Sequence, residues 1–198
     1  MRLQRHLMIA GAMVIAVAAT TAAALGATSK TKSSPARVHH VQNADELQLG
    51  LTPSSAQLAV CMPGAQLNVK VALTDERGFD KFEISARNLP PNREYTIFLL
   101  QQAGAPFGAA EYIGDFSTNA DGNGHNKLKL IVQEAFSSTV VNGARTRVDL
   151  NRIGVWFADP AADDFCLGVN SPVTPFDGDN AAAVQVFNSA NADPLPAP

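Results

Sequence analysis

Amide and carboxylate side chains that could bind a hard cation alternate in the turn Asn119–Gly124. Their oxygen atoms have the spacing of the first ligands of a calcium loop, and Gly124 could take its sharp turn. A calcium loop of the EF-hand type also needs a bidentate glutamate at its twelfth position, where this chain has Leu130. Lys127 adds a positive charge to the same stretch. The pattern therefore favours a plain β-turn, and calcium binding through Asp121 is the alternative.

Two further groups of aspartates occur toward the C-terminus. One lies beside Cys166 and the other lies in the sequence FDGD; their members are Asp159, Asp163 and Asp164, and then Asp177 and Asp179. Either group could supply oxygen ligands to calcium if its loop converges with another. Aspartates in turns also accept hydrogen bonds from nearby backbone N–H groups. We prefer this second interpretation and keep calcium as the alternative.

The sequence lacks the residue patterns of several common chemistries, so it predicts no catalytic residue. A blue-copper site needs a histidine and a methionine soon after its cysteine, and neither follows Cys166. There is no Gly-x-Ser-x-Gly nucleophile motif and no glycine-rich phosphate loop. A serine–histidine–aspartate arrangement would have to use His125, which lies in a polar turn. The glutamates have no spacing that pairs them for glycoside cleavage; they include Glu83, Glu94, Glu111 and Glu134.

The chain has two cysteines, Cys61 and Cys166, which lie 105 residues apart. In an exported protein, two cysteines are most simply one disulfide. Two separate buried thiols are the alternative. A disulfide would tie the beginning of the folded domain to its end.

The N-terminus indicates export. Arg2 and Arg5 precede the apolar run Leu7–Val17, and small residues follow to Ala27, as in a secretory signal peptide. We therefore expect residues 1–27 to be removed, with an uncleaved membrane anchor as the alternative. Residues 28–50 are polar and predict a flexible leader, in which His39-His40 would be a weak metal site.

The net charge of −3 indicates no nucleic-acid partner, because such a partner requires a basic face. It also indicates no electrostatic docking to an anionic membrane, so any membrane contact would come from the N-terminal segment.

Hydrophobic residues alternate with polar ones from Leu58 onward. The alternation is clearest in Leu67–Leu73 and Phe82–Ala86, and it predicts strands with one buried face. Further strands are expected around Tyr95–Leu99, Glu111–Ser117, Lys127–Val132, Val148–Phe157, Phe165–Val169 and Ala183–Phe187. Eight or nine short strands separated by glycine, proline and asparagine predict an all-β antiparallel sandwich over residues 51–189. The ambiguous stretch Val132–Val141 leaves room for at most one short helix, and residues 190–198 are expected to be a disordered tail.

One stretch resembles a known family. The sequence LPPNREYTIFLL, with Leu89, Pro91 and Tyr95, is similar to the corner of fibronectin type III and related immunoglobulin-like sandwiches. Its continuation into GDFSTNADGNG is similar to secreted bacterial sandwich domains. The resemblance implies an immunoglobulin-like sandwich in which the Tyr95 hydroxyl bonds to nearby backbone, and it implies no binding residues.

Two aromatic residues are candidate ligand contacts. Trp156 alternates with Val155 and Phe157, so if these two face the core, Trp156 lies on the outer face of its strand. There it could be exposed or covered by a loop or the tail. Tyr112 could line the same carbohydrate or peptide surface.

These observations predict a non-catalytic exported module for binding or structural roles at or outside the cell surface, with a protein or a glycan as partner. The alternative is a secreted hydrolase or metal-dependent enzyme that uses the acidic loops. An enzyme should gather its titratable groups in one concave pocket, whereas a binding module should present a groove or face with exposed aromatics.

Overall fold

The computed structural model describes residues 39–40, 46–73, 78–176 and 180–195, which all belong to one compact unit spanning residues 34–198. Nearly all of the regular structure is β-strand. The described strands are β1 (His39–His40), β2 (Glu46–Pro53), β3 (Gln66–Ala72), β4 (Asp80–Arg87), β5 (Glu94–Leu100), β6 (Ala110–Ser117), β7 (Gly124–Leu130), β8 (Phe136–Val141), β9 (Ala144–Asp149), β10 (Arg152–Phe157), β11 (Thr174–Phe176), β12 (Asn180–Ala182) and β13 (Gln185–Asn188). The described helices are α1 (Ala56–Cys61) and α2 (Asp164–Leu167).

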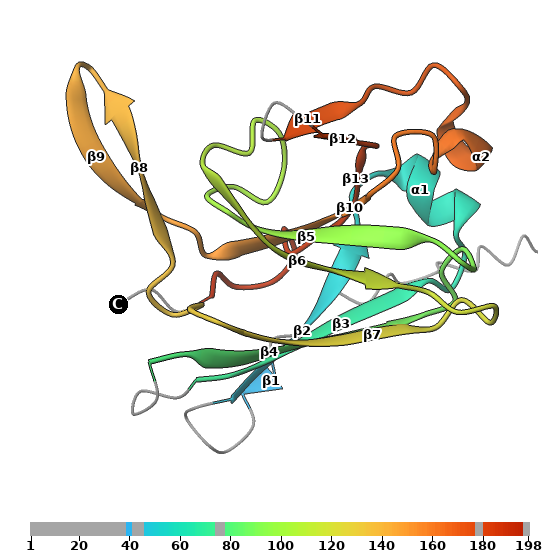
Figure 1. The fold of residues 1–198 in the computed structure, drawn as a ribbon, viewed down its shortest axis with the longest axis horizontal. Coiled ribbons are helices and arrows are strands. Elements are labelled where there is room, and N and C mark those ends of the chain that lie inside the picture. The colour runs from blue at the N-terminus through green and yellow to red at the C-terminus, as the bar shows by residue number, and fades with distance from the viewer. Residues whose placement is uncertain (1–38, 41–45, 74–77, 177–179, 196–198) are drawn as a thin grey trace, which may run out of the picture. The chain divides into compact units, whose positions relative to one another are not determined.

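Eight strands form one hydrogen-bonded path in the order β6-β5-β10-β13-β2-β3-β4-β7, and β1 pairs with β2. Every pairing in the path is antiparallel. The path changes layer at a short pairing between β13 and β2, which aligns Phe187 with Pro53 and Asn188 with Thr52. Strands β5, β6 and β10 therefore lie over β3, β4 and β7 (Figure 1). This arrangement confirms the predicted all-β antiparallel sandwich.

The core lies between the two layers and follows the alternation in the sequence. In β3 and β4 every second side chain is buried, from Leu67 to Val71 and from Phe82 to Ala86. The opposite layer contributes a matching set of fully buried side chains: Tyr95, Ile97, Leu99, Ile153, Val155, Phe157 and Phe187. Removing this apolar surface from water is the main stabilising term of the fold.

The predicted disulfide is present. Cys61 ends α1, Cys166 lies within α2, and their Cα atoms are 5.7 Å apart. Ser55 caps the N-terminus of α1, because its side chain accepts a hydrogen bond from the Leu58 backbone N–H at 3.2 Å. The Gln57 side chain also donates to the Cys166 carbonyl at 3.0 Å. The disulfide thus fastens the two helices together at one end of the sandwich.

The described fold is larger at both ends than the sequence predicted. Strand β2 begins at Glu46, so Glu46–Gly50 belong to the sheet and not to a flexible leader. Toward the C-terminus, Leu195 is buried and its N–H donates to the Asn151 carbonyl at 2.8 Å. Residues 190–195 therefore pack on the sandwich. The predicted signal peptide, residues 1–27, lies outside the described residues.

The expected strand at Phe165–Val169 is wrong, because Asp164–Leu167 form helix α2. The Asp163 carbonyl accepts from the backbone N–H of both Cys166 and Leu167, which closes a helical turn. With α1, the described residues contain two short helices where the sequence predicted at most one.

The ambiguous stretch before residue 141 forms half of a hairpin and no helix. Strands β8 and β9 pair from Phe136 with Asp149 to Val141 with Ala144. The two-residue turn between them consists of Asn142 (φ 50°) and Gly143 (φ 80°), and two positive φ angles are typical of the tight turns that suit β-hairpins. We call residues 136–149 the arm. Figure 1 shows the arm extending away from the sandwich.

The corner at Leu89–Arg93 differs from the one that the resemblance implied. The Tyr95 hydroxyl is buried against Phe116 and Phe157 and has no hydrogen-bond partner among the described residues. Thr118 fastens the corner instead, because its hydroxyl donates to the Pro90 carbonyl at 2.7 Å and accepts from the Arg93 N–H at 3.0 Å. The hydroxyl that binds the corner thus comes from the residue that follows β6.

No helix among the described ranges has the length and apolar character needed to cross a bilayer.

Replacing Cys61 and Cys166 together by serine should lower the free energy of unfolding by about 4–5 kcal/mol. The disulfide closes a loop of 105 residues, and removing it gives the unfolded chain more conformational freedom. Chemical denaturation of the oxidised protein and the double variant measures the difference. Equal midpoints and slopes for the two proteins would contradict the expected contribution.

Candidate functional site

The strongest candidate site is a groove that opens between β6 and β7. These strands are bridged near one end, where Thr118 pairs with Gly124. Toward their other ends they leave a hollow of about 450 Å³, which we call the groove. Its lining residues are Glu111, Tyr112, Ile113, Leu130, Ile131, Glu134, Ala135 and Phe136.

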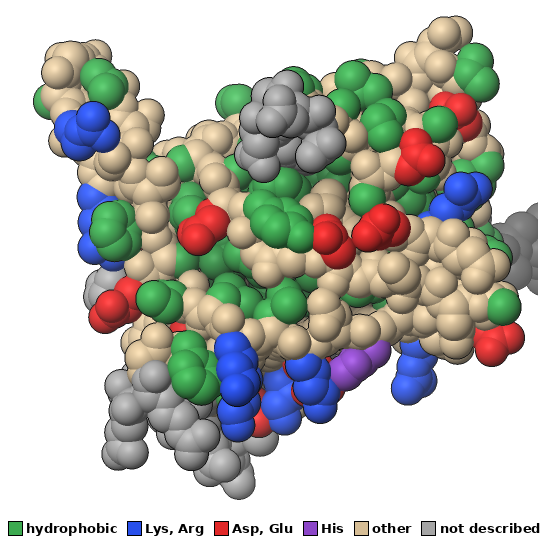
Figure 2. Space-filling view, in the orientation of Figure 1, with side chains coloured by type: hydrophobic (Ala, Val, Ile, Leu, Met, Phe, Trp, Pro, Cys, Tyr) green, Lys and Arg blue, Asp and Glu red, His purple; other side chains and the backbone are tan. Residues whose placement is uncertain are grey.

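The groove combines exposed apolar side chains with carboxylates. Ile131, Phe136 and Tyr112 are each about half exposed, at 55%, 53% and 49%. Glu111 and Glu134 are exposed, and neither forms an ion pair with another described residue. Figure 2 shows acidic side chains among hydrophobic ones on the face that contains β6. Exposed aromatic side chains are enriched at surfaces that bind a partner, and unpaired charges beside them can select a partner of opposite charge.

Tyr112 is fixed in place by two contacts. Its hydroxyl donates to Asp115 Oδ2 at 2.6 Å, and its ring meets the Phe98 ring edge-on at 5.8 Å between centroids. The hydrogen bond to Asp115 raises the pKa of Tyr112 to about 12, because the tyrosinate would lie beside a carboxylate. The phenol is therefore neutral at physiological pH and offers the groove an uncharged aromatic surface.

Trp156 lies on the outer face of β10, as the alternation predicted, but it is fully buried. Phe98 and Phe107 meet its ring edge-on at 5.4 and 5.1 Å, and its indole N–H donates to Thr174 Oγ1 at 3.2 Å. The exposed position considered for Trp156 is therefore wrong, and the alternative of coverage by a loop is correct. Trp156 supports Phe98, which in turn supports Tyr112.

The floor of the groove is anchored to the core. Asp80 is buried, and its Oδ2 accepts from the N–H groups of Val132 and Gln133 at 2.8 and 3.1 Å. The Leu150 N–H donates to the Ala135 carbonyl at 2.9 Å. These bonds fix both chain segments from which the arm departs, so the arm has a rigid base.

The described aspartates that were considered as calcium ligands do not come together. No group of three or more histidine, cysteine or acidic side chains that could hold a metal occurs in the described parts of the chain. Asp177 and Asp179 lie outside those parts, and so do the side chains of His39 and His40.

Several of these aspartates and their neighbours instead bond to backbone or hydroxyl groups. Asp163 is fully buried, accepting from Ser171 Oγ at 2.6 Å and from the Val184 N–H at 3.1 Å. Asp159 accepts from the Ala161 N–H at 2.9 Å. In the turn before β7, Asn119 Oδ1 accepts from the N–H groups of Asp121 and Asn123 at 3.0 and 2.9 Å, as in a plain turn.

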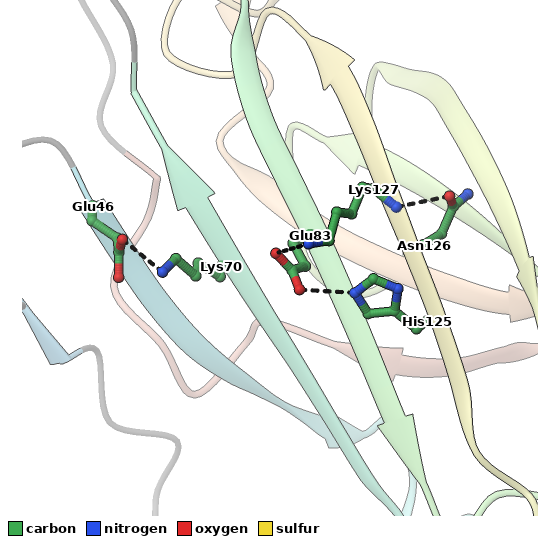
Figure 3. Close-up of polar contacts among 6 residues, drawn as sticks. All are labelled: Glu46, Lys70, Glu83, His125, Asn126 and Lys127. Atoms are coloured by element: carbon green, nitrogen blue, oxygen red, sulfur yellow. Dashed lines mark hydrogen bonds and ion pairs between the residues drawn. The ribbon is translucent and has the colours of Figure 1, made fainter.

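A polar face covers β2, β3, β4 and β7 on the side away from the core. Lys70 Nζ lies 2.7 Å from Glu46 Oε2, and Glu83 contacts both His125 Nε2 at 2.8 Å and Lys127 Nζ at 3.4 Å (Figure 3). The hydrogen bond from His125, with help from Lys127, lowers the pKa of Glu83. The hydrogen bond from Lys70 lowers the pKa of Glu46 in the same way. These charges are already paired, so this face offers less to a partner than the groove.

Two other hollows are less suited to binding. One, of about 280 Å³, lies on the polar face between Gln48 and Ser85. The other, of about 400 Å³, lies beside the disulfide and the Leu89–Arg93 corner, with Phe165 as its exposed aromatic. Neither combines exposed apolar side chains from two elements with unpaired carboxylates.

The sequence pointed to Tyr112 but not to the rest of the groove. Glu111 and Glu134 were considered only as possible catalytic acids, and Ile131 and Phe136 fell in or beside an ambiguous stretch. The Asn142-Gly143 pair was the available signal, because Asn-Gly between two runs of strand-forming residues predicts a β-hairpin.

No protein-family model matches this chain, and a search of curated proteins finds no match either.

Replacing Asp163 by alanine should lower the free energy of unfolding by about 1–3 kcal/mol, because the Val184 N–H and the Ser171 hydroxyl would lose their buried acceptor. Asp159→Ala is the matched control and should change it by less than about 0.5 kcal/mol, since Asp159 is exposed. Thermal and urea denaturation measure both. An equal loss in the two variants would show that the burial of Asp163 has no special effect.

The Glu83 ion pairs should make stability depend on pH. Because its folded pKa lies below the ordinary 4.5, the unfolded chain binds the proton more readily. The stabilisation is thus present at neutral pH and is lost as the pH falls from about 4.5 through the lower folded pKa. Urea denaturation from about pH 7 to about pH 3 measures the free energy of unfolding of the wild type and of Glu83→Gln. The two values should differ at neutral pH and converge at acidic pH. A constant difference would contradict this.

Proposed function

We propose that this chain is an exported, non-catalytic β-sandwich module that binds an extended segment of a protein partner in the groove. The proposal is carried by the groove, which lies where β6 and β7 separate. There, Tyr112 and Ile131 are exposed beside β6. Strand β6 pairs with β5 on one side, but over Ala110–Ile113 its other edge pairs with no described strand. The unpaired backbone of such an edge can accept an added strand.

The side chains around this edge favour a particular segment. An added strand would present alternate side chains to the groove, and apolar ones would cover Tyr112 and Ile131. Lysine or arginine at the intervening positions would meet Glu111 and Glu134, which have no described ion-pair partner. The preferred segment is therefore extended, with apolar and basic residues.

Export is part of the proposal. The Cys61–Cys166 disulfide suits an oxidising compartment, and the N-terminal sequence is typical of a signal peptide. The module would act at or outside the cell surface after residues 1–27 are removed. The alternative of a hydrolase or metal-dependent enzyme has no observation among the described residues in its favour, and we do not propose it.

Tyr112→Ala should weaken binding of a peptide of the preferred kind at least tenfold, because one of the two aromatic side chains that line the groove would be lost. The probe is a fluorescent synthetic peptide in which valine alternates with arginine, and fluorescence anisotropy measures its binding. A peptide with glutamate in place of arginine should bind more weakly than the first, because Glu111 and Glu134 would repel it.

Phe165→Ala is the matched control, since Phe165 is an aromatic residue of similar exposure that lies outside the groove. It should leave peptide binding unchanged. Equal binding of both peptides, equal loss in both variants, or binding of soluble oligosaccharides but not of peptides would contradict the proposed site.

A further inference from the structure

The arm has the surface of a docking element. Its strands β8 and β9 pair with each other and with no other described strand. A two-stranded hairpin has little stability of its own in water, and both of its outer edges have unpaired backbone groups. Near its tip, Val140 and Val141 are 63% and 48% exposed. An exposed apolar tip of this kind gains from being covered by another surface.

The charge of the arm complements that of the groove. Arg145 lies directly opposite Val140 in the hairpin, and its Nη1 donates to Ser138 Oγ at 2.9 Å. No carboxylate pairs with Arg145 in the described part of the chain, whereas Arg147 pairs with Asp149 at 3.2 Å and lies over the Phe136 ring. Figure 2 shows basic and hydrophobic side chains together on the projecting arm. The arm thus presents apolar residues and an unpaired positive charge.

The arm cannot fill the groove of its own molecule. Phe136 lines the groove and also begins β8, so the five residue steps to Val141 place the tip about 17 Å further along the strand. The paired strands and the anchored base hold the hairpin extended, away from the groove. An arm that docks in a groove must therefore dock in that of another molecule.

We propose that the arm of one copy binds in the groove of a second copy of this chain. Val140 and Arg145 are partners across the hairpin and lie on one of its faces. Val140 covers Ile131 and Tyr112, and Arg145 lies between Glu111 and Glu134. The inference rests on the proposed function and names the partner segment of that same groove. Each copy has one arm and one groove, so the contacts close into a ring or continue as a chain.

Charge reversal tests this arrangement. Sedimentation velocity of the full chain, purified after export, should show self-association that increases with concentration. Arg145→Glu alone should weaken it at least tenfold, and so should the double variant Glu111→Arg with Glu134→Arg, because each brings like charges together. A mixture of the two variants should regain association, since every arm then meets a groove of opposite charge. Arg87→Glu, an equal change in charge at the other end of β4 from Asp80, should have no effect.

A full chain that remains monomeric overturns the inference, as does association that is unaffected by Arg145→Glu or not regained in the mixture. Binding of the arm to anionic phospholipid vesicles in an Arg145-dependent manner, without self-association, also overturns it in favour of a membrane surface. If the chain is monomeric but the peptide probe still binds in a Tyr112-dependent manner, only this inference fails. If neither self-association nor peptide binding occurs, the proposed function fails as well.

Discussion

Strands β6 and β7 pair with each other only at the bridge between Thr118 and Gly124, and the groove depends on this constraint. These consecutive strands lie in opposite layers and come close at the turn that joins them. At Gly124 a side chain would meet the Phe116 ring at 2.8 Å and the Ser117 carbonyl at 2.9 Å, so only glycine allows the approach. The turn is also fastened there, because Thr118 bonds to the Leu89–Arg93 corner. Beyond the bridge, the Asn126 side chain of β7 still donates a hydrogen bond to the Asp115 carbonyl of β6. The groove lies further along, beside the first residues of β6 and the end of β7.

Aromatic side chains on the outer face of the layer formed by β5, β6 and β10 give the groove a rigid wall. A row of aromatic rings crosses β10, β5 and β6, from Trp156 through Phe98 to Tyr112. Trp156 is fully buried and Tyr112 is half exposed, so the row begins in a small second core and ends at the solvent. An aromatic side chain held in this way loses little conformational freedom when a partner covers it, which favours binding.

Alternation along the sequence was sufficient to predict strands such as β3 and β4, because each of them buries one face in the core. It did not predict the first half of β2, which the sequence analysis assigned to a flexible leader. The same reasoning failed for β8 and β9, whose side chains are mostly exposed and follow no core. It also failed at α2, where helical hydrogen bonds to Asp163 outweigh the apolar character of Phe165–Val169. The strand expected around Val148–Phe157 is divided in the structure, because β9 ends at Asp149 and β10 begins at Arg152 in a different sheet.

The sequence by itself determined the all-β class, the pairing of Cys61 with Cys166 and the outward direction of Trp156. Each follows from the local alternation of apolar and polar residues or from the chain having two cysteines. None of the three depends on how the two layers meet. Only the tertiary structure decided that Trp156 is covered while Tyr112 is exposed, and that Glu111 and Glu134 flank one groove. Those outcomes depend on contacts between segments far apart in the chain, and a local pattern of residue types does not specify which distant segment will cover a given side chain.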